Sequence, residues 1–388
     1  MPPERLTILV DENIPYAFES FGPLGSVRRA AGRHIAPADV RDVDVLIVRS
    51  VTRVDERLLA GSPVTFVGTA TIGCDHVDLA YLAANGIGFA SAPGSNANSV
   101  AEYVVAALLL SARARGASVE GASLAIVGVG NVGSRVAAKA AGLGMRCLLN
   151  DPPRQRQTGD PAFLPLDEVI AAADYVTLHV PLERGGPDPT VGMAGRSFFA
   201  KLRHGTVFLN TSRGAVVDEA CLAAALDEGR VPHAVLDVWQ HEPDIDLEMV
   251  RRTFIGTPHI AGYSFDGKVA ATLMLHAALC AWLQRPSAPP DLSAVLPPPA
   301  VPSVDLRHAE GSDEDLLRAA VGAVYDIEAD DRALREAVAR RDGGVQFDRL
   351  RRDYRRRREF PYTTVALARG CAALAAKAAS LGFRVETH

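Results

Sequence analysis

The chain has few of the residues and segments that mark disulfide-rich, metal-binding or membrane proteins. Its five cysteines are scattered along 388 residues without a Cys-x-x-Cys pair. This spacing argues against a disulfide framework or a zinc site and is typical of a reducing cytosol. No apolar run approaches the about 18 residues that a membrane-spanning helix needs. We therefore expect a cytoplasmic protein with no metal and no membrane partner. A strand-like run begins at Leu6, which leaves no room for a signal peptide.

The chain also lacks an excess of charge of one sign. The formal net charge is -5, with 22% charged and 48% hydrophobic residues, which is the composition of an ordinary globular protein. Nothing in this balance favours nucleic acid as a partner. The arginine run Arg351–Arg358 has acidic residues around it, so we interpret it as helix surface and interface ion pairs rather than a nucleic-acid site.

Short apolar runs alternate with helical patterns through the first 285 residues. Most runs are continuous, which is typical of parallel strands covered on both faces. Helical patterns such as 131–141 and 218–226 lie between them, and the alternation predicts a doubly wound α/β fold. The expected strands are Leu6–Val10, Val45–Val48, Thr65–Gly68, Leu124–Val127, Cys147–Asn150, Tyr175–Leu178, Val207–Leu209 and Ala234–Leu236.

Two features divide the chain into expected domains. A long apolar helix over about residues 100–113 precedes a new strand–loop–helix unit, and a Pro-rich linker covers 286–302. We expect two doubly wound, Rossmann-like domains with parallel sheets, one formed by 1–99 and 260–285 and the other by 100–259. A C-terminal α+β domain is expected within 286–388, after the linker.

The motif Gly128-x-Gly130-x-x-Gly133 follows an expected strand and opens an expected helix. Gly128 permits a tight turn, Gly130 lets the backbone approach a pyrophosphate, and Gly133 lets helix and strand pack closely. The helix N-terminus offers N–H groups and a partial positive charge to the diphosphate. The motif predicts a dinucleotide site, and the alternative is an ordinary strand-to-helix turn.

Asp151 ends the next expected strand, at the position where a carboxylate accepts hydrogen bonds from the cofactor ribose. Such a carboxylate repels a 2′-phosphate, which favours NAD over NADP. Arg154 and Arg156 follow closely and count against this preference, because arginine can accommodate a 2′-phosphate.

Arg213, Glu242 and His259 each lie just beyond an expected parallel strand, where open α/β sheets bind their ligands. Hydride transfer from an alcohol needs a base for the hydroxyl proton, and an imidazole beside a carboxylate suits that role. An arginine can hold a substrate carboxylate through its planar fork. Taken singly, each of these residues could be structural, and His241 competes with His259 for the role of base.

These motifs together resemble the D-isomer-specific 2-hydroxyacid dehydrogenase family over about residues 1–285. The resemblance rests on the glycine motif, Asn210-x-x-Arg213-Gly214, Asp237-Val-Trp-x-x-Glu242-Pro243 and Thr257-Pro-His259. It implies an NAD-dependent oxidoreductase in which Arg213 binds the substrate carboxylate and His259 is the acid and base, with Glu242 as its partner. It also implies a substrate-binding domain of 1–99 and 260–285 and an NAD-binding domain of 100–259. The expected cofactor contacts are Gly128, Gly130, Asn131, Val132, Gly133, Asp151, Val180, Thr211, Ser212, Asp237 and Gly262.

Further motifs resemble one branch of this family, whose members oxidise 4-phospho-D-erythronate with NAD in bacterial pyridoxal 5′-phosphate synthesis. They are Val10–Tyr16, Val48–Arg53, Phe66–Thr71, Asn150–Pro153 and His259–Tyr263. The resemblance implies Ser50, Thr71 and Tyr263 as contacts to a small phosphorylated hydroxy acid. It implies that the C-terminal domain mediates a homodimer. The chain departs from the expected pattern at Thr211-Ser212, where the branch has Ala-Cys, and at Val180, which lacks a hydroxyl.

The residue types in the N-terminal loops also suggest an anion-binding site, independently of the resemblance. Arg49 and Arg53 flank hydroxyl groups at a strand end, which suits a phosphate, and the alternative is a helix N-cap with surface arginines. Thr71 lies in a small-residue loop that could donate backbone N–H groups or be a plain turn. We interpret Asp11–Asn13 as a turn and assign it no catalytic role. One arginine of Arg351–Arg358 could instead reach a substrate phosphate.

Two other functions remain open from the sequence. The chain could be a different D-2-hydroxyacid dehydrogenase, acting on 3-phosphoglycerate or glyoxylate. It could also be an NAD(H)-sensing binding protein, since such proteins can retain the same arginine, glutamate and histidine.

Overall fold

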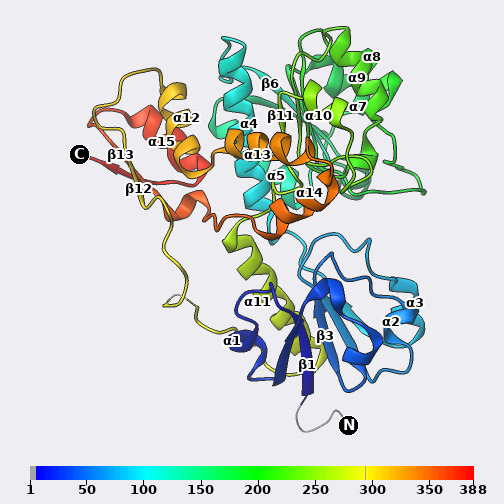
Figure 1. Ribbon diagram of the computed structural model, residues 1–388. Helices are drawn as coiled ribbons and strands as arrows, with labels where there is room; N and C mark the ends of the chain where they lie inside the picture. The colour runs from blue at the N-terminus through cyan, green and yellow to red at the C-terminus, as the bar shows by residue number, and fades with distance from the viewer. Residues whose placement is uncertain (1–5, 293) are drawn as a thin grey trace. The chain divides into compact units, whose positions relative to one another are not determined.

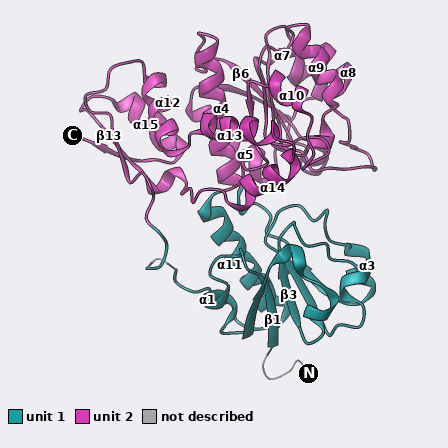
Figure 2. Cartoon of the chain, viewed as in Figure 1, with its two compact units in different colours: residues 1–96, 264–297 teal, residues 97–263, 298–388 magenta. Residues whose placement is uncertain are grey.

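The computed structural model describes residues 6–292 and 294–388. Their backbone forms two compact units, each built from two stretches of sequence (Figure 2). Unit 1 comprises residues 1–96 and 264–297, and unit 2 comprises residues 97–263 and 298–388. The structure thus groups 298–388 with the glycine motif, and the predicted division into three functional domains stays a prediction.

Unit 1 is built on a parallel sheet with the strand order β2-β1-β3-β4-β5. On one face, Ile8 and Val10 pack with Leu275 of α11, and on the other Leu46 packs with α2 and α3. The expected cover on both faces is therefore confirmed. The elements are β1 (Leu6–Asp11), α1 (Ala17–Phe21), β2 (Gly25–Ala30), β3 (Val45–Val48), α2 (Glu56–Leu59), β4 (Phe66–Thr69), α3 (Leu79–Ala84), β5 (Gly88–Ala90) and α11 (Phe265–Trp282).

Unit 2 contains a second parallel sheet, with the order β11-β10-β9-β8-β6-β7. Helices α4 and α5 cover one face, and α7, α8 and α9 cover the other (Figure 1). The strands are β6 (Ser123–Val127), β7 (Arg146–Asn150), β8 (Tyr175–Leu178), β9 (Val207–Asn210), β10 (Ala234–Leu236) and β11 (Ile255–Gly256). The helices are α4 (Ala97–Ala114), α5 (Asn131–Gly142), α6 (Pro152–Thr158), α7 (Leu166–Ala172), α8 (Arg196–Lys201), α9 (Glu219–Asp227) and α10 (Leu247–Arg252).

The sheet order places the ends of β9, β10 and β11 side by side. Arg213 follows β9, Glu242 follows β10 and His259 follows β11. Because neighbouring parallel strands end at the same edge, these loops are brought together by the topology. This edge is where the candidate site forms.

The C-terminal part of unit 2 adds a small parallel sheet with the order β12-β13-β14. Buried side chains of this C-terminal part, including Leu317, Tyr325 and Phe360, belong to the same hydrophobic core as residues of α4 and α5. Asp331 of α13 accepts a hydrogen bond of 2.7 Å from the Gly256 N–H, which covers the edge strand β11. The elements are β12 (Ser303–Asp305), α12 (Asp313–Val324), α13 (Ile327–Val338), α14 (Gly343–Arg352), β13 (Thr364–Leu367), α15 (Ala372–Leu381) and β14 (Arg384–Thr387).

The arginine run Arg351–Arg358 is only partly a solvated surface: Arg352, Arg355 and Arg356 are exposed, but that interpretation was wrong for the last two arginines of the run. Helix α14 ends at Arg352. Arg357 and Arg358 are only 4% and 5% exposed, and Arg357 pairs with the buried Glu102 of α4. The buried acidic partner of Arg357, which local sequence does not reveal, makes the burial of this arginine possible.

Two absences can be stated for the residues that the structure describes. None of the five cysteines, all within the described residues, forms a disulfide bond. None of the described helices is long and apolar enough to cross a membrane.

Candidate active site

The centre of the site is a pair formed by His259 and Glu242. The His259 Nδ1 lies 2.7 Å from the Glu242 Oε2, and the second carboxylate oxygen accepts a 2.9 Å hydrogen bond from the Trp239 N–H. Burial raises the pKa of Glu242, but His259 and these hydrogen bonds outweigh burial and hold that pKa below its ordinary value. An ionised Glu242 fixes the imidazole with Nδ1 towards it, so that Nε2 is the nitrogen that can take a substrate proton.

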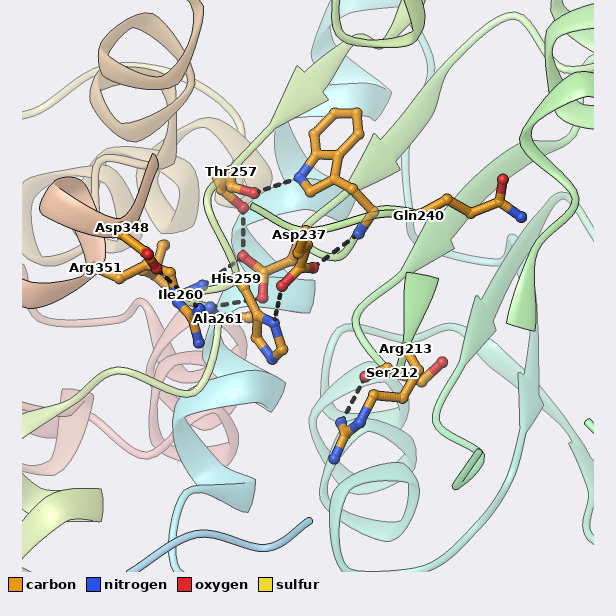
Figure 3. A network of polar contacts seen from close by, with 12 residues as sticks. Ser212, Arg213, Asp237, Gln240, Thr257, His259, Ile260, Ala261, Asp348 and Arg351 are labelled. Carbon is orange, nitrogen blue, oxygen red and sulfur yellow. Dashed lines mark hydrogen bonds and ion pairs between the residues drawn. The ribbon is translucent and has the colours of Figure 1, made fainter. Parts of the chain in front are cut away.

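Asp237 holds the loop that carries His259 (Figure 3). Its carboxylate, 1% exposed, accepts hydrogen bonds from the Thr257 hydroxyl and from the Ile260 and Ala261 N–H groups, at 2.6 to 2.9 Å. Its carbonyl accepts from the His259 N–H at 2.7 Å. These bonds keep His259 at a φ of 57°, in the left-handed region that few non-glycine residues adopt. The predicted role of Asp237 as a cofactor contact stays a prediction.

Arg213 sits on a loop that is held from both sides. The Asn210 amide donates to the Arg213 carbonyl at 3.0 Å and accepts from the Ser212 N–H at 3.0 Å. A Cβ at Gly214 would lie 1.8 Å from the Trp239 carbonyl oxygen, so only glycine lets this loop pack against the one carrying Glu242. The half-buried Arg213 therefore has a defined position at the same sheet edge as the His259–Glu242 pair.

His241, the competing histidine, is exposed. The structure therefore favours His259 as the base.

The three glycines of the motif fit a dinucleotide. A Cβ at Gly128, where φ is 87°, would lie 2.8 Å from the His179 backbone, and one at Gly133 would lie 2.0 Å from the Gly128 carbonyl oxygen. A Cβ at Gly130 would meet nothing within 4 Å. The outer glycines thus serve the turn and the helix packing, while Gly130 borders open space before Asn131 and Val132, the first residues of α5. This is the division of roles that a bound pyrophosphate needs.

We expect Gly133 and Gly130 to respond differently to replacement by alanine. Gly133→Ala should lower the free energy of unfolding by roughly 1–3 kcal/mol, because the methyl group overlaps a backbone oxygen. Gly130→Ala should fold normally and weaken NADH binding at least tenfold, or by about 1.4 kcal/mol. Urea unfolding and NADH fluorescence titration of both variants test this. Wild-type NADH affinity in Gly130→Ala would contradict it.

Asp151 is bonded to the loop of the glycine motif, and its predicted role as a cofactor contact stays a prediction. Its carboxylate accepts hydrogen bonds from the Val129 N–H at 2.8 Å and the Arg154 N–H at 3.0 Å, and each oxygen keeps a second lone pair. The Arg154 guanidinium donates to the Val129 carbonyl, and Arg156 pairs with Asp188. Both arginines thus have protein partners, which weakens the argument for a 2′-phosphate.

His179 is a residue of this region that sequence reasoning missed. Its ring contacts the Thr177 hydroxyl at 3.0 Å and the Thr211 hydroxyl at 3.2 Å. Burial lowers the pKa of His179 to about 3, so the ring is neutral. His179 precedes the expected cofactor position Val180 in the sequence, and its ring contacts Thr211, another expected cofactor position. Its place directly after β8 is the signal that could have identified it.

The expected substrate residues of unit 1 lie at the ends of β3 and β4. The Arg49 Nε is 3.1 Å from the carboxylate of Asp11, which is fully buried, and Ser50 is exposed beside it. Burial, followed by repulsion from Arg49, lowers the pKa of Lys268 to about 8. Asp11 and Lys268 were not expected here, because their proximity to Arg49 depends on the tertiary structure.

Thr71 belongs to a chain of hydrogen bonds within unit 1. Its hydroxyl donates to the Gly73 carbonyl at 2.9 Å and lies 2.7 Å from the Thr69 hydroxyl, which in turn contacts His76. Because the Thr71 proton is already used, a contact to substrate would come from its backbone or from a lone pair.

Comparison with known proteins places these features in a family. The description "D-isomer specific 2-hydroxyacid dehydrogenase, NAD binding domain" matches residues 96–261, and a domain of unknown function matches residues 295–382. The chain is similar to the erythronate-4-phosphate dehydrogenase of Salinibacter ruber, at 48% identity over 93% of this chain and 94% of the relative. Its similarity to the enzyme of that name from Cronobacter sakazakii is 43% identity over 99% of both chains.

The fold of this chain is similar to the folds of solved dehydrogenase structures. D-lactate dehydrogenase of Aquifex aeolicus, solved with NAD and lactic acid, is 23% identical, with a TM-score of 0.59 over 71% of this chain and 95% of that one. The 3-phosphoglycerate dehydrogenase of Entamoeba histolytica, solved with NAD+, is also 23% identical, with a TM-score of 0.62 over 72% and 96%. These likenesses establish the arrangement of elements.

Proposed function

The chain belongs to the erythronate-4-phosphate dehydrogenase family, and we propose that it oxidises 4-phospho-D-erythronate to the 2-oxo acid with NAD. The observation that carries the proposal is the 2.7 Å contact between His259 and Glu242, on the same sheet edge as Arg213. In this proposal the reaction serves pyridoxal 5′-phosphate synthesis, the pathway implied by the sequence resemblance.

Each of the three side chains has a chemical role in the proposal. Arg213 binds the substrate carboxylate, because its planar guanidinium matches two carboxylate oxygens. His259 accepts the proton of the C2 hydroxyl at Nε2, and Glu242 stabilises the imidazolium that forms. Bound NAD supplies the hydride acceptor. In the reverse direction the His259 Nε2–H returns the proton to the carbonyl oxygen.

The glycine motif and its neighbours would hold the cofactor. Gly128, Gly130 and Gly133 with Asn131 and Val132 suit the diphosphate, since α5 offers N–H groups at its N-terminus. Asp151 suits the ribose. The remaining proposed contacts are Val180, Thr211, Ser212, Asp237 and Gly262.

For the substrate we propose Arg49, Ser50, Thr71 and Tyr263 as further contacts. The Arg49 guanidinium is oriented by the buried Asp11, and an oriented cation suits a phosphate dianion. These assignments rest on the resemblance together with the positions of the side chains at strand ends.

We also propose a cytoplasmic homodimer. The scattered cysteines, without a Cys-x-x-Cys pair, support the location. The dimer rests on the resemblance of the C-terminal region to its counterpart in the family branch, and light scattering on the purified chain tests it.

The reaction is tested by following NADH absorbance with purified protein, NAD and 4-phospho-D-erythronate, with and without a 2-oxo acid acceptor. Parallel assays use 3-phospho-D-glycerate and glycolate, the product of glyoxylate reduction, and replace NAD by NADP. We expect turnover with 4-phospho-D-erythronate and a preference for NAD.

Two outcomes would overturn the proposal in different ways. Oxidation of 3-phospho-D-glycerate or glycolate, without turnover of 4-phospho-D-erythronate, would keep the reaction and change the substrate. No turnover of any acid, with NADH still bound, would favour a sensing protein.

A further inference from the structure

The Thr71 hydroxyl belongs to a short chain of polar contacts that follows β4. Its oxygen lies 2.9 Å from the Gly73 carbonyl oxygen and 2.7 Å from the Thr69 hydroxyl oxygen. The Thr69 oxygen in turn lies 2.9 Å from the Nε2 of His76. Thr69 is fully buried, whereas Thr71 is half-buried. Thr71 therefore carries the hydroxyl of this pair that a ligand can reach, and all four residues belong to unit 1.

Only one direction of this chain makes all three contacts hydrogen bonds. A carbonyl oxygen can only accept, so the single hydroxyl proton of Thr71 goes to Gly73. The contact between the two hydroxyls then needs the proton of Thr69. Because that proton is used in turn, the His76 Nε2 carries a proton and donates it to Thr69. The Thr71 side chain has no proton left for a ligand.

The Thr71 oxygen keeps one position at which it can accept a hydrogen bond. A hydroxyl oxygen has two lone pairs, and the Thr69 hydroxyl occupies one of them. No donor from the described residues occupies the second. A carboxylate or a phosphate dianion has no proton to offer there, and its oxygens would face a lone pair. The ligand group that fits is a hydroxyl group.

The neighbouring strand ends in a residue with the opposite property. Val48 of β3 pairs with Thr69 of β4, and the Ala70 N–H donates to the Val48 carbonyl at 2.8 Å. Arg49 and Thr71 therefore follow two adjacent strands, which lie about 4.8 Å apart. The Arg49 guanidinium can only donate, whereas the Thr71 side chain can only accept. This pair suits a ligand that has an anionic group and a hydroxyl group on neighbouring carbon atoms.

We propose that Thr71 is a specificity-determining residue: its oxygen accepts a hydrogen bond from the C3 hydroxyl group of 4-phospho-D-erythronate. C3 is bonded to C4, which bears the phosphate. The C2 hydroxyl reacts at His259 in the proposed function, so the C3 hydroxyl is the one that remains for Thr71. 3-Phospho-D-glycerate has no such second hydroxyl. The inference rests on the proposed function and deepens it, because it names the substrate group that Thr71 recognises.

The test compares two substrates, 4-phospho-D-erythronate and its 3-deoxy analogue D-2-hydroxy-4-phosphobutanoate, by NADH formation. Wild type should prefer the first about 5- to 100-fold in kcat/KM, because the analogue leaves the Thr71 oxygen without its donor. Thr71→Val should lose this preference. It should do so through a higher KM for 4-phospho-D-erythronate, while its kcat/KM for the analogue and its NADH affinity stay close to wild type.

Three more variants separate recognition from folding. Thr71→Ser keeps the hydroxyl and should retain the preference for 4-phospho-D-erythronate. Thr65→Val is the matched control, because Thr65 directly precedes β4 at its other end and is exposed. It should behave as wild type with both substrates. If Thr71→Val does not fold, Thr71→Ala takes its place.

The inference is overturned if wild type uses the two compounds equally well, or if Thr71→Val loses the same factor with both. Either result leaves the proposed function intact, because 4-phospho-D-erythronate is still oxidised. A wild-type protein that turns over neither compound would instead overturn the proposed function, before any variant is compared.

Discussion

Replacing His259 by glutamine is expected to lower kcat by roughly 10²–10⁴-fold, the usual contribution of a general base. Glutamine can still accept a hydrogen bond from the substrate hydroxyl, but it cannot take the proton at neutral pH. The fold should remain, because the loop is held by Asp237 through the backbone of Ile260 and Ala261. The measurement is NADH formation at saturating substrate, together with thermal unfolding and NADH affinity.

The matched control is His241→Gln, because His241 is also a histidine beside Glu242 but is exposed. It should retain wild-type turnover. Glu242→Gln should lie between the two, since it removes the charge that orients His259 while keeping an acceptor for the Trp239 N–H. Equal activity of His259→Gln and wild type would remove His259 from the mechanism.

Replacing Arg357 by methionine is expected to destabilise the protein by about 3–5 kcal/mol, the effect of breaking a buried ion pair from one side. The Arg357 and Glu102 side chains are 2% and 0% exposed and lie 2.5 Å apart. Glu359 lies next to them and accepts from the Ser99 hydroxyl at 2.7 Å. Without the guanidinium, two carboxylates would share a buried site. Urea unfolding measures the loss.

The pH dependence of this loss has a definite sign. Burial, although opposed by Arg357, already raises the pKa of Glu102 to about 7 from its ordinary 4.5. Removing the cation raises that pKa further, so the folded variant binds a proton near neutral pH that the unfolded chain does not. Its stability should therefore rise as the pH falls from about 8 to 6.

The control for this prediction is Arg356→Met, because Arg356 is the adjacent arginine and is exposed. It should leave the unfolding midpoint within about 0.5 kcal/mol of wild type. A similar loss in both variants, or a loss in Arg357→Met that grows at low pH, would contradict the assignment of a buried Glu102–Arg357 pair.

The interior strands could be predicted because their side chains are buried on both faces. Val45–Val48 and Tyr175–Leu178 are continuous apolar runs, and the structure has strands with the same bounds. The edge strands β2 and β5 were not expected. β2 carries exposed Arg28 and Arg29, and β5 has only three residues, so neither shows the apolar run of a buried strand.

Sequence alone placed Arg213, Glu242 and His259 after strands, but it did not determine which side chains contact them in space. The choice between His241 and His259 required the tertiary structure, which turns one imidazole to Glu242 and leaves the other exposed. The arginine run shows the same limit. Arg357 and Glu102 are 255 residues apart in sequence, and no local spacing indicates such a pair.

The sequence by itself determined what depends on local chemistry: the parallel strands, the three glycines of the turn before α5 and the residue types at the strand ends. These follow from burial patterns, from the absence of a Cβ and from the known reactions of side chains. The tertiary structure decided which charges meet. It brought Glu242 to His259, Asp11 to Arg49 and Glu102 to Arg357, because a contact between distant segments depends on how helices and strands pack and not on their order in the chain.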